Sequence, residues 1–262
     1  MSCDAAAAVA AARLACDNRA HQTEVSLPDG PLVLADPALA IDPDEVLRFQ
    51  GYKRGRDIPG PDVRALFDTA LAEGRRLMRP RAVVRWAPVT GVAADALEVD
   101  GERLAIPRIG ALWGEVEHAA VALCTIGEAL ERRVAELWEA RELPLASMLD
   151  SVGSGAVESL AEYVNDVLCQ QALPSLKVTN RISPGYADWD VAEQRRLFRL
   201  CPGDVIGVVL NEACVMSPGK SISLLAGAGR DARVDHYFSQ CARCWMRDCA
   251  YRRVPARATV HR

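Results

Sequence analysis

The feature that most constrains the fold is a long, one-sided helical pattern in the middle of the chain. Between positions 147 and 172 apolar residues recur every three or four positions, at Leu149, Val152, Ala156, Leu160, Val164 and Leu168. This spacing places them on one face of an α-helix, and a helix with a single apolar stripe needs another layer to cover that stripe. Gly153 and Gly155 lie inside the pattern with no strand before them, which predicts close helix packing instead of a dinucleotide-binding turn.

Strands that could form the covering layer come in blocks. Strand-like runs are expected at 82–86, 96–99, 104–106, 121–125, 177–179, 205–210, 213–216 and 221–226, and further helices at 45–49, 61–79, 127–139 and 191–200. Asp100-Gly101 and the run from Ser217 to Lys220 are expected to be hairpin turns. Blocks of strands and helices, without strict alternation, predict an α+β fold: a curved, largely antiparallel sheet with flanking helices, not a Rossmann fold.

Three segments are expected along the chain. Residues 1–36 form an Ala-rich N-terminal segment, residues 37–230 form the core, and residues 231–262 form a basic, Cys-rich C-terminal segment. Within the core, residues 37–125 are a candidate small N-terminal subdomain.

The bulk composition excludes several classes of function. Charged residues make up 25% of the chain and the net charge is −4, so no overall attraction to nucleic acid or to an anionic membrane is expected. The sequence has no apolar run long enough to span a bilayer, and Asp4 stands where a signal peptide would be basic. We therefore expect a cytoplasmic protein whose nine cysteines are thiols or metal ligands.

The segment from Thr179 to Asp190 is the main candidate for a ligand site. Arg181 offers a planar fork that suits a carboxylate, and Tyr186 offers a flat ring and a hydroxyl. Between them the Pro-Gly step predicts a tight turn that can approach a small ligand closely. The residues alone fit either a zwitterionic amino acid ligand or a structural turn with an arginine ion pair.

This segment, RISPGYADWDVAEQRRLF, resembles the S-adenosylmethionine-binding loop of the activation domain of cobalamin-dependent methionine synthase, whose fingerprint is Arg, three residues, then Gly-Tyr. The preceding AVESLAEYVND from Ala156 and the following LNEACVMSPGKSIS from Leu210 are similar to the helix and the hairpin that flank that loop. IDPDEVLRFQGYKRG near Ile41 and CTIG at Cys124 resemble stand-alone relatives, so the resemblance covers roughly residues 40–227.

The resemblance implies a role in reductive methylation, the reactivation of cob(II)alamin by one electron and a methyl group from S-adenosylmethionine. The chain carries no Asp-x-His-x-x-Gly cobalamin motif. It would therefore act in trans on a corrinoid methyltransferase or on methionine synthase modules, with an electron donor such as flavodoxin. No catalytic residue is assigned. The implied ligand contacts are Arg181 to the methionyl carboxylate, backbone groups of Ser183 and Gly185, the Tyr186 side chain, and Glu158, with Glu162 as the alternative, to the ammonium group.

A second constellation lies near the C-terminus, where Cys241, Cys244 and Cys249 follow a C-x2-C-x4-C spacing. Thiolates this close together can share a zinc ion or an iron–sulfur cluster, although three free thiols fit the sequence equally well. A fourth ligand would come from Cys3, Cys201, Cys214, His236 or an exchangeable group. The alternative function is therefore a metal-containing interaction or electron-transfer protein on the same fold.

Overall fold

The structure, a computed structural model, describes residues 27–54 and 56–235 and confirms the predicted α+β fold. Its main sheet has the strand order β4-β3-β2-β5-β9-β6, and β1 pairs with β2 beside this path. All of these pairings are antiparallel. The strands are β1 (Pro31–Ala35), β2 (Arg81–Val92), β3 (Ala96–Val99), β4 (Glu102–Ala105), β5 (His118–Thr125), β6 (Lys177–Val178) and β9 (Ser221–Gly229).

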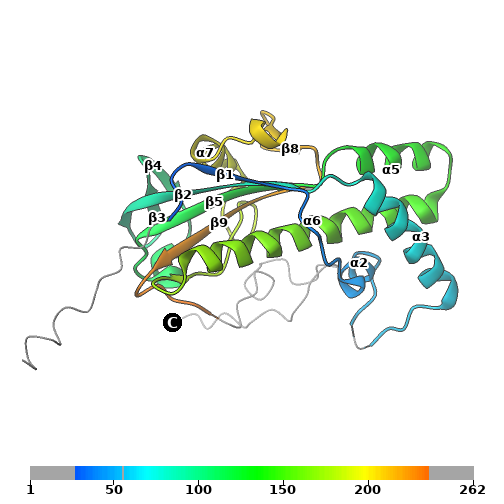
Figure 1. Cartoon of the computed structure of the whole chain (residues 1–262), viewed down its shortest axis with the longest axis horizontal. Helices are drawn as coiled ribbons and strands as arrows, with labels where there is room; N and C mark the ends of the chain where they lie inside the picture. The colour runs from blue at the N-terminus through cyan, green and yellow to red at the C-terminus, as the bar shows by residue number, and fades with distance from the viewer. Residues whose placement is uncertain (1–26, 55, 236–262) are drawn as a thin grey trace, which may run out of the picture.

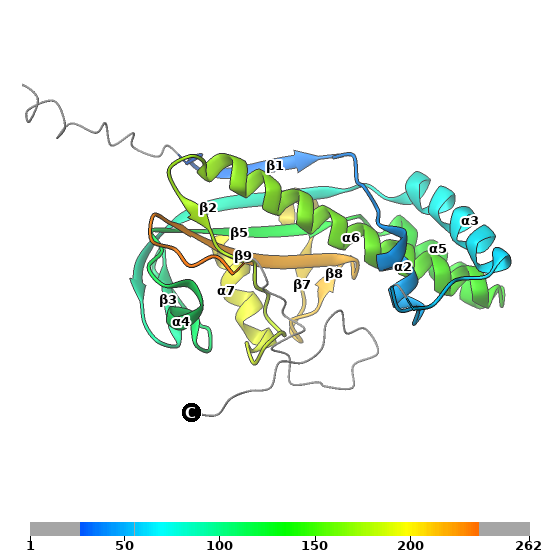
Figure 2. The ribbon, with the colours of Figure 1, turned by 90° about the horizontal axis from the view of Figure 1, so that it is seen from below.

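One long helix, α6 (Leu143–Ala172), runs along a face of this sheet (Figures 1 and 2). Three helices pack around its N-terminal half: α2 (Pro43–Phe49), α3 (Pro61–Leu77) and α5 (Ala129–Glu139). The opposite face of the sheet carries α4 (Ile109–Trp113) and α7 (Gln194–Leu200). Within the described part of the chain, no helix is long and apolar enough to cross a membrane.

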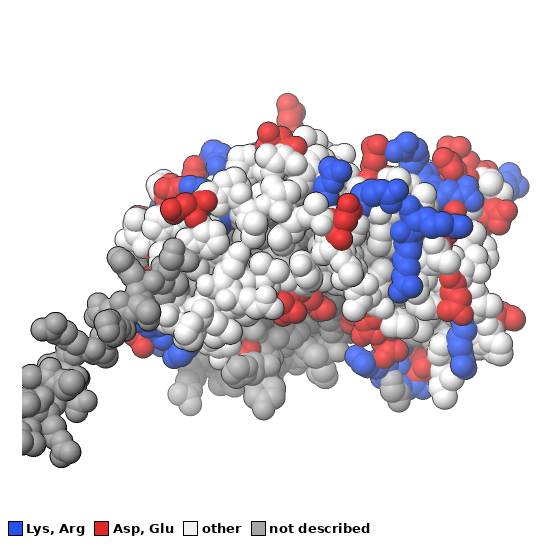
Figure 3. All heavy atoms as spheres, viewed as in Figure 1, with Lys and Arg blue, Asp and Glu red and all other residues white. Residues whose placement is uncertain are grey.

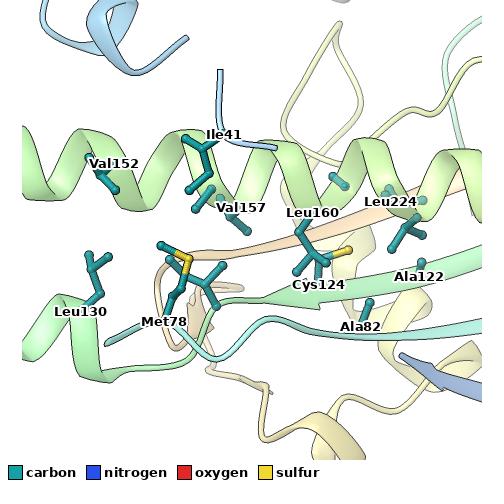
Figure 4. Packing of buried hydrophobic residues seen from close by; sticks show 14 of the residues in the cluster. Ile41, Met78, Ala82, Ala122, Cys124, Leu130, Val152, Val157, Leu160 and Leu224 are labelled. Atoms are coloured by element: carbon teal, nitrogen blue, oxygen red, sulfur yellow. The ribbon is translucent and has the colours of Figure 1, made fainter. Parts of the chain in front are cut away.

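The central strands are buried on both faces and divide their side chains between two cores. Along β2, Ala82 and Val84 belong to the core under α6, whereas Val83 and Ala87 belong to the core under α4 and α7. This alternation follows from the two-residue period of a strand. Figure 4 shows the first core, in which the apolar stripe of α6 faces Cys124 and its neighbours on the sheet.

The two glycines of α6 are packing positions, as the sequence predicts. A Cβ atom added to Gly155 would lie 2.7 Å from Val46 Cγ2 on α2, and one added to Gly153 would lie 2.8 Å from Leu130 Cδ2 on α5. Both distances are shorter than real carbon contacts. The missing side chains therefore let α2 and α5 approach α6.

The expectation of strands at 205–210 and 213–216 is largely wrong. Residues Asp204–Ile206 form a 3-10 turn, η2, which ends at Gly207 with a φ of 76°, and only β7 (Val209–Leu210) and β8 (Met216–Ser217) pair as a short hairpin. Cys214, which lies between these two strands, has a φ of 59°, so most of the run 213–216 forms a turn. The sequence analysis also missed β1 and α4.

Candidate functional site

The candidate loop leaves the sheet at the end of β6 and is fixed there on both sides of Arg181. The Thr179 backbone N–H donates to Gly227 O at 2.8 Å, and the Gly227 N–H donates to Thr179 Oγ1 at 2.9 Å. Beyond the arginine, Ile182 exchanges two backbone hydrogen bonds with Leu225 of β9, at 2.9 and 2.8 Å. Arg181 is thus held between two attachments to the same strand.

The Arg181 side chain reaches α6 and pairs with Glu158. Its Nη2 donates to Glu158 Oε2 at 3.2 Å, and the two side chains are only 19% and 23% exposed. Glu162, the alternative carboxylate, lies one helical turn further along and is exposed. The structure therefore brings Arg181 together with the first of the two predicted glutamates, in a partly buried pair.

The rest of the loop holds a tight turn that exposes Tyr186. Ser183 is buried and Gly185 has a φ of 88°, a backbone geometry that favours glycine. The Gly185 N–H donates to Trp189 O at 2.8 Å, which closes the turn. Trp189 is 3% exposed and anchors the end of the turn in the core, whereas Tyr186 is 51% exposed.

Two further residues of this turn, Ala187 and Asp188, have φ values of 51° and 68°. Non-glycine residues adopt such values at a cost of the order of 1 kcal/mol each, and they do so where the surroundings fix them. Sequence analysis gave no sign of this strain. The two values show that the surroundings of the turn fix its backbone in this geometry.

Cys124 of β5 lies under the ion pair. Its thiol is fully buried and points toward Leu160 of α6 (Figure 4). Burial raises the pKa of Cys124 to about 12, while the nearby Arg181 charge acts to lower that pKa and Glu158 acts to raise it. At neutral pH the thiol is therefore protonated and uncharged, so it is not a nucleophile.

The face drawn in Figure 3 carries no large field of one sign over its described residues. In Figure 3, charged side chains of both signs gather over α3 and α5, and much of the remaining described face is uncharged. A charged ligand at Arg181 and Glu158 would be recognised by that pair.

The predicted metal cluster of Cys241, Cys244 and Cys249 lies outside the described residues. Among the residues that the structure does describe, no group of three potential metal ligands comes together. Two proposed fourth ligands, Cys201 and Cys214, are buried, and burial raises the pKa of Cys201 to about 12. Cys201 is thus a neutral thiol at neutral pH.

Comparison with known proteins identifies the fold. No model of a known protein family matches the sequence, and no curated protein matches it. Among solved structures, the crystal structure of the MetH reactivation domain bound to AdoHcy is similar, with a TM-score of 0.62 and 16% sequence identity. The similarity covers 82% of this chain and 82% of that chain. The chain therefore has the fold of the methionine synthase reactivation domain, as the sequence motifs predicted.

Proposed function

We propose that the chain binds S-adenosylmethionine with its amino acid end between Arg181 and Glu158. The observation that carries this proposal is the partly buried ion pair, 3.2 Å long, beside a loop that exposes Tyr186. The fold supports it, because the similar MetH domain was crystallised with AdoHcy, the demethylated form of this ligand.

The two charges of the pair match the two charges of a zwitterion. A ligand carboxylate would take the Arg181 fork and a ligand ammonium would take Glu158, so each protein charge would face an opposite charge of the ligand and the net charge would not change. Such an arrangement favours ligands that carry both groups, because a ligand with one of them would leave a protein charge unpaired in a partly buried place. Gly185 and Tyr186, which lie further along the same loop, would contact the remainder of the ligand.

We further propose that the bound ligand serves reductive methylation of cob(II)alamin on a partner. One electron from a donor such as flavodoxin reduces cob(II)alamin to cob(I)alamin, whose cobalt electron pair attacks the sulfonium methyl group. The S–CH3 bond breaks, a Co–CH3 bond forms, and S-adenosylhomocysteine leaves. The chain positions the methyl group, and no acid, base or nucleophile of its own is needed. The partner would be a corrinoid methyltransferase, or methionine synthase modules, supplied in trans.

Calorimetric titration with S-adenosylmethionine tests the ligand. Truncating one member of a buried charged pair costs about 2 kcal/mol or more, so Arg181→Ala should weaken binding by about thirtyfold. Arg103→Ala is the control, because Arg103 also pairs with a glutamate, Glu98, at 2.9 Å, but on the exposed surface of β3 and β4. S-Adenosylhomocysteine should bind, and 5′-methylthioadenosine, which lacks the amino acid part, should not.

The role is tested separately from the ligand. The protein is mixed with methionine synthase that lacks its own reactivation domain, in the cob(II)alamin state, together with reduced flavodoxin and S-adenosylmethionine. Formation of methylcobalamin, followed by its absorption spectrum, is expected only with the wild-type chain. Absence of ligand binding would refute the whole proposal, whereas binding without methylation would refute the reactivation role with this partner.

A further inference from the structure

A cleft of about 420 Å³ lies away from the candidate loop, where α2, α5 and α6 meet. It is lined by aromatic residues at the C-terminal ends of α2 and α5 and by polar residues of α6. We call it the α2–α5–α6 cleft. Its volume is in the range of small-molecule sites in proteins, and neither the sequence motifs nor the proposed function uses it.

One wall of the cleft is aromatic. Trp138, from the last turn of α5, is 49% exposed, and Phe49, from the last turn of α2, lines the same cleft. The guanidinium of Arg48 lies 4.2 Å from the centre of the Phe49 ring, which leaves that ring less free than the indole. A half-exposed indole beside a hollow offers a flat apolar surface on which a ring can stack.

The opposite side of the cleft is polar and is held in place. The two N–H bonds of Gln50 Nε2 are shared among three acceptors: the backbone O and the hydroxyl of Ser147, both at 3.0 Å, and the hydroxyl of Ser151 at 2.6 Å. These bonds fix the end of α2 against α6 and orient two hydroxyl groups at the cleft. The polar side of the cleft is therefore preorganised.

Two residues that line the cleft, Asp150 and Ser154, are both contacted by Lys220. Lys220, from the turn between β8 and β9, donates to Asp150 Oδ1 at 2.8 Å and to Ser154 Oγ at 2.9 Å. Within the described residues no other group engages the Asp150 carboxylate, so its second oxygen stays an acceptor, and the lysine ammonium retains a third N–H. An acceptor beside a donor matches two adjacent hydroxyl groups of one ring.

We propose that the α2–α5–α6 cleft binds a neutral ring that carries adjacent hydroxyl groups, either the ribose of a nucleoside or a free sugar. One ring face stacks on Trp138, one hydroxyl donates to Asp150, and its neighbour accepts from Lys220. The ligand is neutral because the lysine and the aspartate already balance each other. The sulfonium of S-adenosylmethionine is disfavoured here, since it would lie beside the Lys220 ammonium. The cleft would therefore be a second site, with a ligand different from that of the site at Arg181.

Ligand-observed NMR on the full chain tests the proposal, with adenosine and methyl α-glucoside as separate probes. We expect at least one of them to bind in the range of about 1 mM, which corresponds to a few hydrogen bonds and one stacked ring. Trp138→Ala should weaken that binding at least about tenfold, because the stacking surface is lost. Asp150→Asn, which keeps the shape and removes the charged acceptor, should weaken it as well.

Two controls establish that the probe binds in this cleft and not elsewhere on the protein. Tyr163→Ala removes an aromatic side chain of similar exposure, 39%, from α6 outside the cleft and should leave probe binding unchanged. Excess S-adenosylmethionine should not displace the probe, and Trp138→Ala should still bind S-adenosylmethionine, which also shows that this variant is folded.

The outcomes decide the ligand as well as the site. Binding of adenosine alone assigns a nucleoside, and binding of the glucoside alone assigns a sugar. The proposal is overturned if neither probe binds, if Trp138→Ala binds as tightly as the wild type, or if S-adenosylmethionine displaces the probe. The comparison of the two probes on the wild type, Trp138→Ala and Tyr163→Ala does not depend on whether the site at Arg181 works as proposed; only the two controls with S-adenosylmethionine do.

Discussion

Replacing Gly155 by valine should destabilise the fold, because α2 lies directly on this glycine. A Cβ atom there would be 2.7 Å from Val46 Cγ2, about 1 Å less than an ordinary carbon contact. Val46 is fully buried and its branched side chain is stiff, so it cannot turn away. The α2 backbone would have to move, and the added methyl groups of valine enlarge that movement.

Overpacking of this kind costs about 2–3 kcal/mol of unfolding free energy. For a chain of this size the melting temperature should then fall by about 5–10 °C. Urea unfolding measures the loss, with an unchanged dependence on urea if the denatured state is unaffected. Gln170→Val is the matched control, since Gln170 is exposed on the same helix and the substitution there should stay within about 0.5 kcal/mol of wild type. A Gly155→Val protein as stable as this control would refute the packing argument.

Three other predictions concern stability and metal content. Because the pKa of Cys124 is raised from 9.0 to about 12, the unfolded chain loses this proton first as the pH rises, and unfolding free energy should fall by about 1 kcal/mol per pH unit over that window. Urea unfolding at pH 8 and pH 10 should show a smaller fall in Cys124→Ala. Gln50→Ala removes the hydrogen bonds of the Gln50 amide to Ser147 and Ser151 of α6 and should cost about 1–2 kcal/mol, with faster hydrogen exchange in α2. For the three-cysteine cluster near the C-terminus, anaerobically purified protein should be assayed for iron, labile sulfide and zinc; metal-free protein with three freely alkylated thiols would rule out a metal site.

The sequence predicts α6 and the central strands well because their apolar patterns reflect real burial. It fails between positions 205 and 216, where the apolar residues are not buried in the pattern of a strand. Val205, Val209 and Val215 are 52%, 59% and 56% exposed, whereas Ile206, Val208 and Cys214 are buried, and the run folds into turns and a two-residue pairing. Burial of a short run is decided by distant parts of the chain, which local periodicity cannot register.

The candidate site also has residues that the sequence predicts and residues that it does not. The arginine motif is local, so Arg181 and the turn before Tyr186 can be identified in the sequence. The sequence cannot decide between Glu158 and Glu162, because both lie on a shared face of the helix. Only the docking of the loop on β9 determines which glutamate pairs with the arginine. The pair of Asp150 and Lys220 has no local signature at all, because the two residues meet only when the turn before β9 folds against α6.

The geometry of α6 explains why one helix can line two different sites. At 100° per residue, Ser147, Ser151, Ser154 and Glu158 follow one strip along its flank, about 16 Å long, beside the apolar stripe that faces the sheet. Lys220 contacts this strip at Ser154 and divides it, so that an aromatic wall and hydroxyl groups lie on one side and the charged pair with Arg181 lies on the other. A cation that binds at Glu158 therefore meets a like charge if it extends toward Trp138, and a neutral ring does not. In the two sites proposed above, the lysine would therefore separate the ligands by charge, while the buried stripe of α6 holds the residues of both sites on one helix.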